Sequence, residues 1–216
     1  MKLIILDFDG TLGDTRANIV LTMTDTMRHL GLPVSNEKDI ISTIGLPLEK
    51  GFEKLFPELG AEDILRCCQS YREIFEKNKK VLVPALFPGV RETLAELKKR
   101  GYVLTVASSR RSSSLGAFLK DMEIAEYISY VLGADNVAKA KPDPEPVLMT
   151  LEAFGCPASE ALVVGDMPVD IFMGKGAGAK TCGVTYGNSS RVELLFSGAD
   201  YIIDSFPEIL EALKKA

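Results

Sequence analysis

Residues 3–14 read Leu-Ile-Ile-Leu-Asp-Phe-Asp-Gly-Thr-Leu-Gly-Asp, and this stretch decides how the rest of the chain is interpreted. The apolar run 3–6 ends abruptly at Asp7 and Asp9. A short run of isoleucine and leucine that ends in a turn signal is typical of a buried parallel strand. Open parallel sheets bind their ligands beyond the carboxyl ends of the strands. We therefore expect both carboxylates to lie where chemistry is done.

A purely structural alternative makes Asp7 and Asp9 turn-forming residues. Asp and Gly do favour turns, which explains Asp9-Gly10. The alternative does not explain Asp7, which still belongs to the end of the apolar run. Two carboxylates this close repel each other unless a cation or a shared proton relieves the repulsion. The pattern favours a functional pair.

Composition limits the classes of protein to which the chain can belong. Its 216 residues are 46% hydrophobic and 25% charged, and the net charge is -5. An acidic chain of this kind argues against a nucleic-acid partner. No apolar run approaches the ~20 residues that span a bilayer. Four cysteines form no zinc-binding pattern. We expect a cytoplasmic protein with reduced cysteines and no membrane partner, as a monomer or weak homodimer.

The pattern of apolar residues divides the chain into two parts. Residues 15–83 show helical spacing and no convincing strand, which predicts an inserted all-α block. From residue 84 onward, short strands alternate with helices, which predicts βαβ units and a parallel sheet. The expected fold is α/β, a Rossmann-like doubly wound core of residues 1–14 and 84–216. The inserted block, next to the carboxylate loop, is expected to act as a lid; the alternative is a helical domain with no gating role.

Further polar residues follow the other expected strands. Ser108 and Ser109 end one strand and offer a hydroxyl and a backbone N–H to a phosphate, although a serine-rich helix cap is an alternative. Asp166 ends another strand, and Asp170 follows four residues later. One or both can join Asp7 in a magnesium site, because Mg²⁺ prefers oxygen ligands. For Asp170, a helix N-terminal acid is an equal alternative.

The segment Asp-Phe-Asp-Gly-Thr-Leu-Gly-Asp-Thr resembles the first motif of the haloacid dehalogenase superfamily, and three later segments match in order. The chain is most similar to the phosphoglycolate phosphatase-like branch with a helical cap, residues 15–83. The resemblance implies a magnesium ion held by Asp7, Asp166 and the Asp9 carbonyl, with Asp170 in support. It also makes Lys141, in a Lys-Pro-x-Pro setting, a phosphate-binding residue. We assign Thr11 to the phosphate-binding set and expect it to orient Asp9 and the loop.

The resemblance further implies a reaction. Asp7 would attack the phosphorus of a small phosphorylated metabolite, and Asp9 would serve as general acid and then base. Alternatives are a sugar-phosphate mutase and a non-catalytic phosphate-binding regulatory protein. Mutases of this build use a histidine soon after the first motif, and His29 lies too far along to match. Met167 and Ser109-Arg110 depart from common family residues and leave the substrate open.

Overall fold

A computed structural model describes residues 2–214, and its centre is a parallel sheet of six strands. The strand order is β5-β4-β1-β6-β7-β8. The strands are β1 (Leu3–Leu6), β4 (Val103–Ala107), β5 (Tyr130–Leu132), β6 (Ala161–Gly165), β7 (Lys180–Val184) and β8 (Tyr201–Ile203). β1 pairs with β4 on one side and with β6 on the other, and later strands extend the sheet in both directions. The carboxyl end of β1 is therefore the topological switch point of the sheet.

Helices cover both faces of the sheet because successive residues of β1 point to opposite sides. Ile4 and Leu6 pack in one buried cluster, and Leu3 and Ile5 pack in another. The first cluster contains residues of α5 (Val90–Lys99), α6 (Ser112–Asp121) and α10 (Ile209–Ala212). The second contains residues of α7 (Glu145–Phe154) and α8 (Pro168–Gly176). All four β1 residues are buried, which explains why the sequence shows an unbroken apolar run.

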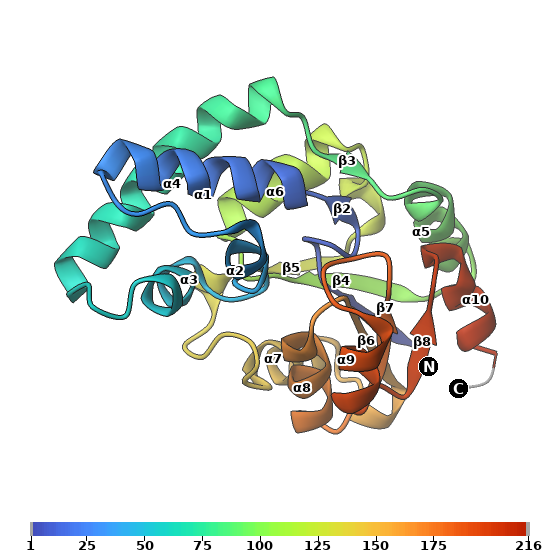
Figure 1. The fold of residues 1–216 in the computed structure, drawn as a ribbon. Helices are drawn as coiled ribbons and strands as arrows, with labels where there is room; N and C mark the ends of the chain where they lie inside the picture. The colour runs from blue at the N-terminus through green and yellow to red at the C-terminus, as the bar shows by residue number, and fades with distance from the viewer. Residues whose placement is uncertain (1, 215–216) are drawn as a thin grey trace.

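Four helices between β2 and β3 form a separate block beside the sheet (Figure 1). They are α1 (Arg16–Leu30), α2 (Glu37–Ile41), α3 (Leu48–Leu55) and α4 (Ala61–Val81). Most of their buried apolar residues, among them Met23, Met27 and Phe52, form a cluster of their own, whereas Phe75 of α4 packs in the first cluster of the core. The block therefore has its own apolar core.

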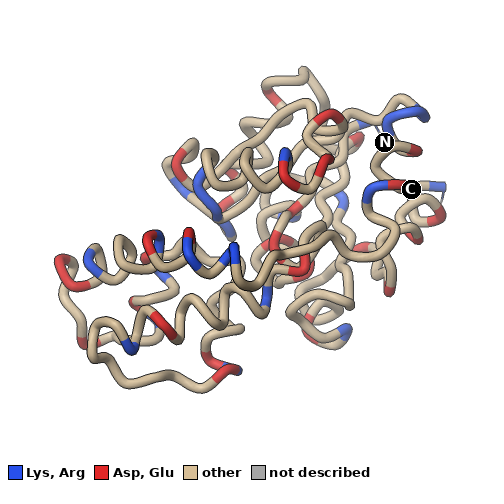
Figure 2. Tube along the Cα trace, turned by 90° about the horizontal axis from the view of Figure 1, so that it is seen from above, with Lys and Arg blue, Asp and Glu red and all other residues tan. Residues whose placement is uncertain are grey.

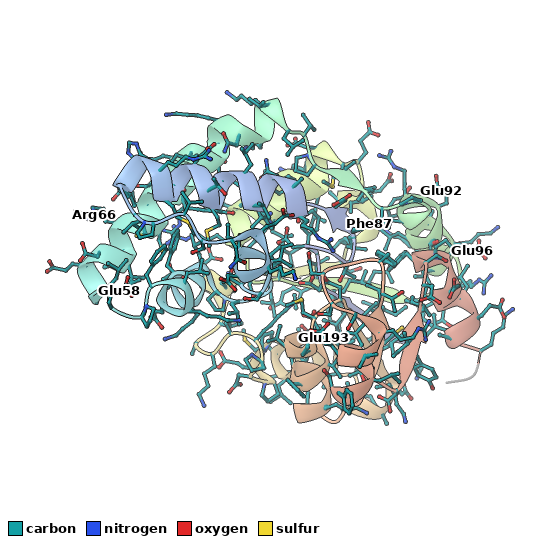
Figure 3. All side chains as sticks on the ribbon, viewed as in Figure 1. Glu58, Arg66, Phe87, Glu92, Glu96 and Glu193 are labelled. Atoms are coloured by element: carbon teal, nitrogen blue, oxygen red, sulfur yellow. The ribbon has the colours of Figure 1, made fainter. Side chains whose placement is uncertain are left out.

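Two short strands join the helical block to the sheet. β2 (Gly13–Asp14) pairs antiparallel with β3 (Ala85–Leu86), so the chain enters and leaves the block through one narrow ribbon. Figure 3 marks Arg66 and Glu58 at the far end of the block, whereas Glu92 and Glu96 lie on α5 at the opposite end of the molecule. Lys, Arg, Asp and Glu are interspersed along the helices in Figure 2.

The expected fold class, a parallel α/β core with an inserted helical block, is confirmed. The sequence analysis missed three features: the β2–β3 ribbon, the short helix α2, and α9 (Arg191–Phe196). None of the helices in residues 2–214 is long and apolar enough to cross a membrane.

Candidate active site

The loop after β1 turns sharply around the carbonyl oxygen of Phe8. That oxygen accepts hydrogen bonds from the backbone N–H groups of Thr11, Leu12 and Gly13 at 3.3, 3.0 and 2.9 Å. Gly10 has a φ of 89°, a conformation that L side chains rarely adopt, and a Cβ there would collide with the Asp166 carboxylate. The glycine thus lets the β1 loop approach Asp166 closely.

Asp7 is buried and shares a lysine with a second carboxylate. Lys141 Nζ lies 2.5 Å from Asp7 Oδ1 and 2.7 Å from Asp170 Oδ1. Burial opposes the charge on Lys141, but Asp170 and Asp7 outweigh it and raise the pKa of the lysine. Asp170 Oδ2 also accepts the Met167 N–H at 3.0 Å at the start of α8. Both interpretations of Asp170 therefore describe its contacts: it caps a helix and belongs to this cluster.

Asp166 lies at the end of β6 and is fully buried. Thr11 Oγ1 lies 3.3 Å from Asp7 Oδ2 and 3.2 Å from Asp166 Oδ1, so one hydroxyl links the two carboxylates. Asn188 holds the other oxygen, Asp166 Oδ2, through its backbone N–H at 2.7 Å and its side-chain Nδ2 at 2.8 Å. The position of Asp166 is thus fixed from two sides.

These acids form a group whose donor atoms suit a hard divalent cation. One carboxylate oxygen each from Asp7, Asp166 and Asp170 lies within 4.8 Å of the others. Burial, followed by the nearby Asp170, raises the pKa of Asp166 to about 7, and burial raises that of Asp7 well above its usual range. Three carboxylates surround one ammonium group, so bound positive charge would favour the ionised form of each acid. The all-oxygen donor set fits Mg²⁺.

The side chain of Asp9 faces a different partner, although it is only two residues from Asp7. Arg110 Nε lies 2.9 Å from Asp9 Oδ1 and 2.7 Å from Oδ2, and Arg110 Nη2 lies 2.7 Å from Oδ1. Thr15 Oγ1 donates to Asp9 Oδ1 at 2.5 Å. The expectation that the Thr11 side chain orients Asp9 is therefore wrong: Thr15 does so, while the Thr11 hydroxyl contacts Asp7 and Asp166.

The two serines after β4 take different positions. Ser108 is buried, and its Oγ accepts the Arg110 N–H at 3.2 Å. Ser109 Oγ instead donates to the carbonyl oxygen of Gly45, in the α2–α3 loop of the helical block, at 2.6 Å. Ser108, Ser109 and Lys141 line one small hollow. Ser108 therefore faces the same hollow as the lysine, and the side chain of Ser109 connects the two parts of the chain.

A cavity of about 590 Å³ lies between the helical block and the sheet. Asp9, Ser109 and Arg110 form part of the wall on the sheet side. Ile44, Gly45 and other residues of the block line the opposite wall. Among residues 2–214, the lining does not include Asp7, Lys141 or Asp166. The Asp9–Arg110 pair is therefore the part of the site that meets this cavity.

Sequence reasoning missed three residues of this site, Thr15, Arg110 and Asn188. Arg110 was noted only as a departure from common family residues, although it directly follows the strand-end serines. Asn188 follows β7, the neighbour of β6, in the polar segment Gly187-Asn188-Ser189. Polar residues at the end of the strand next to Asp166 were the available signal.

Residues 4–184 match the family of haloacid dehalogenase-like hydrolases, and the chain belongs to that family. It is 38% identical over 213 residues to the probable phosphatase IndB of Dickeya dadantii, covering 97% of this chain and 92% of that protein. It is 33% identical over 207 residues to the pyrophosphatase PpaX of Bacillus velezensis, covering 96% and 94%. These relatives place the chain among the phosphatases of the family.

Solved structures show the same fold. The crystal structure of a predicted phosphoglycolate phosphatase from Haemophilus somnus 129pt has a TM-score of 0.83 and 27% sequence identity. The similarity covers 99% of this chain and 98% of that one. It therefore extends over the helical block as well as the sheet.

Proposed function

We propose that the protein is a magnesium-dependent phosphatase that hydrolyses small phosphate monoesters through an aspartyl-phosphate on Asp7. The observation that carries the proposal is the contact of Asp7 with Lys141 inside a buried group that includes Asp166 and Asp170. A buried nucleophile with adjacent positive charge is what attack on an anionic phosphate requires.

Asp7, Asp166 and the Asp9 carbonyl would hold Mg²⁺, with Asp170 in support. Bound there, Mg²⁺ supplies positive charge that offsets the repulsion between the Asp7 carboxylate and the phosphate. Lys141 supplies a further charge from the protein itself, since it lies against Asp7 at 2.5 Å. The Ser108 hydroxyl and the Ser109 N–H would bind phosphate oxygens. The Thr11 hydroxyl would fix the positions of the Asp7 and Asp166 carboxylates relative to each other.

In the proposed reaction an Asp7 oxygen forms a bond to phosphorus as the bond to the leaving oxygen breaks. Asp9 gives its proton to that leaving oxygen. Asp9 then takes a proton from the water that attacks the phosphorus of the aspartyl-phosphate, which releases phosphate and restores Asp7. Two carboxylates with different partners suit two different roles.

The helical block would act as a cap over this reaction. We assign residues 15–83 to the cap and the described residues 2–14 and 84–214 to the catalytic core. The cavity between the two parts, and the contact of Ser109 with Gly45, support a cap that closes over the leaving group. His29 lies on the exposed last turn of α1, which gives no support to a mutase that uses a cap histidine.

A magnesium-dependent assay with p-nitrophenyl phosphate tests the proposal. We expect turnover with Mg²⁺, loss of turnover with a chelator, and a loss of at least ~10³-fold in Asp7→Asn, because the nucleophile is removed. Acid-quenched wild-type protein should gain the mass of one phosphoryl group, and Asp7→Asn should not. Asp121→Asn, an exposed acid that also lines the cavity, is the matched control and should keep its activity.

Three results would contradict the proposal. Full activity in Asp7→Asn would show that another residue is the nucleophile. Binding of phosphate esters without turnover by the wild type would favour a regulatory protein. Isomerisation of a sugar phosphate without release of inorganic phosphate would instead identify a mutase.

A further inference from the structure

The ion pair between Arg110 and Asp9 is the most enclosed charged contact on the wall of the cavity. Both side chains are 11% exposed. The Arg110 guanidinium lies 5.0 Å from the ring centroid of Phe75, in α4, and 4.7 Å from that of Phe118, in α6. Arg110 is thus held between an aromatic ring of the helical block and one of the core, in favourable cation–π positions.

This pair conflicts with the role of Asp9. Both Asp9 oxygens accept hydrogen bonds from Arg110, and Thr15 adds a third donor. A carboxyl group engaged in this way cannot also meet the leaving oxygen of a substrate. The pair must therefore open during each reaction cycle. Opening it without a replacement leaves a buried guanidinium unpaired, which is strongly unfavourable.

The other cations on the cavity wall either pair with acids at the surface or are themselves exposed. Arg72 pairs with Glu49 at 2.8 Å, and Lys79 pairs with Glu76 at 2.7 Å. Each of these acids has a side chain that is more than a third exposed, and Arg111 is exposed. Arg110 is therefore the buried cation that faces the space where a leaving group would lie.

We propose that Arg110 exchanges Asp9 for an anionic group on the leaving group of the substrate, and that this exchange selects the substrate. The substrate class is then small phosphate esters or anhydrides whose leaving group carries a carboxylate or a second phosphoryl group. A planar guanidinium forms paired hydrogen bonds with either anion. The exchange frees the Asp9 carboxyl group to face the leaving oxygen. The inference depends on the proposed phosphatase function.

The test compares substrates that differ in this one charge. 2-Phosphoglycolate and ethyl phosphate have leaving groups of two carbons, and only the first carries a carboxylate. Pyrophosphate offers the second phosphoryl group. We expect wild type to favour 2-phosphoglycolate or pyrophosphate over ethyl phosphate by at least ~100-fold in kcat/KM, because an unpaired buried charge penalises the neutral leaving group. The stronger of the two anionic substrates identifies the anion.

In Arg110→Gln the ratio of kcat/KM for the anionic substrate to kcat/KM for ethyl phosphate should fall to about ten or less, since the guanidinium that binds the anion is gone. Arg110→Lys, which keeps the charge and is the safer variant for folding, should lose about tenfold or more of the preference because it lacks the planar fork. Arg111→Gln, an exposed neighbour that lines the same cavity, is the matched control and should keep the wild-type ratio.

The outcomes separate this inference from the function on which it depends. Equal turnover of ethyl phosphate and the anionic substrates by wild type overturns the inference and leaves the phosphatase function intact. A folded Arg110→Lys protein that keeps the wild-type preference for the anionic substrates over ethyl phosphate would also overturn the inference and leave the phosphatase function intact. If wild type hydrolyses none of these substrates and no p-nitrophenyl phosphate, both ideas fail.

Discussion

Asp7 and Asp9 show how neighbouring residues of one type acquire different partners. They flank Phe8, whose fully buried side chain anchors the loop in the core. The Asp7 carboxylate contacts Lys141, whereas the Asp9 carboxylate contacts Arg110 and Thr15. The two acids are therefore held in different surroundings, as the proposed roles of a nucleophile and a proton carrier require once the Asp9–Arg110 pair has opened.

Asn188 should tune the affinity for magnesium without touching the ion. It donates two hydrogen bonds to Asp166 Oδ2, and its own Oδ1 accepts from Arg16 Nε at 2.8 Å. We expect Asn188→Ala to weaken Mg²⁺ binding about 10- to 100-fold, as is usual when a partner of a ligand is removed. Two Mg²⁺ titrations measure this change. One gives the Mg²⁺ concentration for half of the maximal rise in melting temperature, and the other gives the concentration for half-maximal activity.

Asn36→Ala is the matched control for that substitution. Asn36 is exposed and accepts the Asp39 N–H at 3.0 Å at the start of α2. Its loss should cost about 1 kcal/mol of stability and leave Mg²⁺ binding unchanged. Equal loss of Mg²⁺ affinity in both variants would mean that Asn188 does not act through Asp166.

The raised pKa of Asp166 predicts a dependence of stability on pH. Burial and Asp170 raise the pKa to about 7 from an ordinary 3.8, so the folded protein holds this proton more tightly than the unfolded chain. The stabilisation that this bound proton provides is complete below the pKa of Asp166 in the unfolded chain. It is lost as the pH rises through the folded value of about 7. Without divalent ions, the free energy of unfolding should therefore fall between pH 5 and 7, by up to ~1.4 kcal/mol per pH unit from this group.

Urea unfolding of wild type and Asp166→Asn in a chelator checks this dependence, because the asparagine does not titrate. The difference in stability between the two proteins should change with pH in the stated direction. Mg²⁺ should stabilise the wild type more at pH 8 than at pH 5, since ligands must be ionised to bind it. A pH-independent difference would contradict the prediction.

The sequence predicted the acids of the site better than their partners. Asp7, Asp166 and Lys141 follow strands whose ends must converge in a parallel sheet, so their proximity follows from topology. The Asp9–Arg110 contact depends on the direction in which two loop side chains point. Neither strand order nor residue spacing determines that direction, so Arg110 was missed as a partner.

Among the elements, α8 shows how a small residue lets a helix lie close to a sheet. A Cβ on Gly174 would lie 2.6 Å from Thr181 Cγ2 and 3.0 Å from Val163 Cβ, on β7 and β6. These contacts explain the glycine at position 174 by close packing of the helix against the sheet. Because Asp170 is on the same helix, this packing also positions the carboxylate cluster.

Paired glycine substitutions test that packing. Gly174→Ala should destabilise the protein by about 1–3 kcal/mol, because the added methyl group overfills the interface. Gly116→Ala, in α6, is the matched control, since a Cβ there has no described heavy atom within 4 Å. It should stabilise the protein by about 0.5–1 kcal/mol through lower backbone entropy of the unfolded chain. Urea unfolding measures both, and equal effects would refute the argument.

The missed helix α9 illustrates why some elements escape prediction. It has six residues, and of these only Leu194 is buried. Val192, Leu195 and Phe196 are 58%, 58% and 89% exposed. Apolar residues therefore occur all round the helix and give no one-sided pattern. Its other signal is a capping box, in which the Ser190 N–H lies 2.8 Å from Glu193 Oε2 and the Glu193 N–H lies 3.3 Å from Ser190 Oγ.

For the whole molecule, the decisive feature is that the helical block and the core are joined by one ribbon and meet again across the cavity. β2 and β3 form the ribbon. At the cavity wall, Ser109 donates to the Gly45 carbonyl, and at the start of α1, Arg16 donates to Asn188 and to the Gly187 carbonyl. These contacts hold the block against the core, so breaking one should favour a more open arrangement.

Ser109→Ala tests this coupling because it removes the cross-cavity hydrogen bond while keeping the Ser109 N–H for phosphate. A single hydrogen bond contributes about 0.5–1.5 kcal/mol, so kcat/KM for a small phosphate ester should fall about 2- to 10-fold. Hydrogen exchange in residues 43–47 should rise, because the α2–α3 loop is less often held against the core. Ser114→Ala, on α6 and lining the same cavity, should change neither quantity. Lower activity with unchanged exchange in residues 43–47 would mean that Ser109 acts on the phosphate alone, and that closure depends on the ribbon and Arg16.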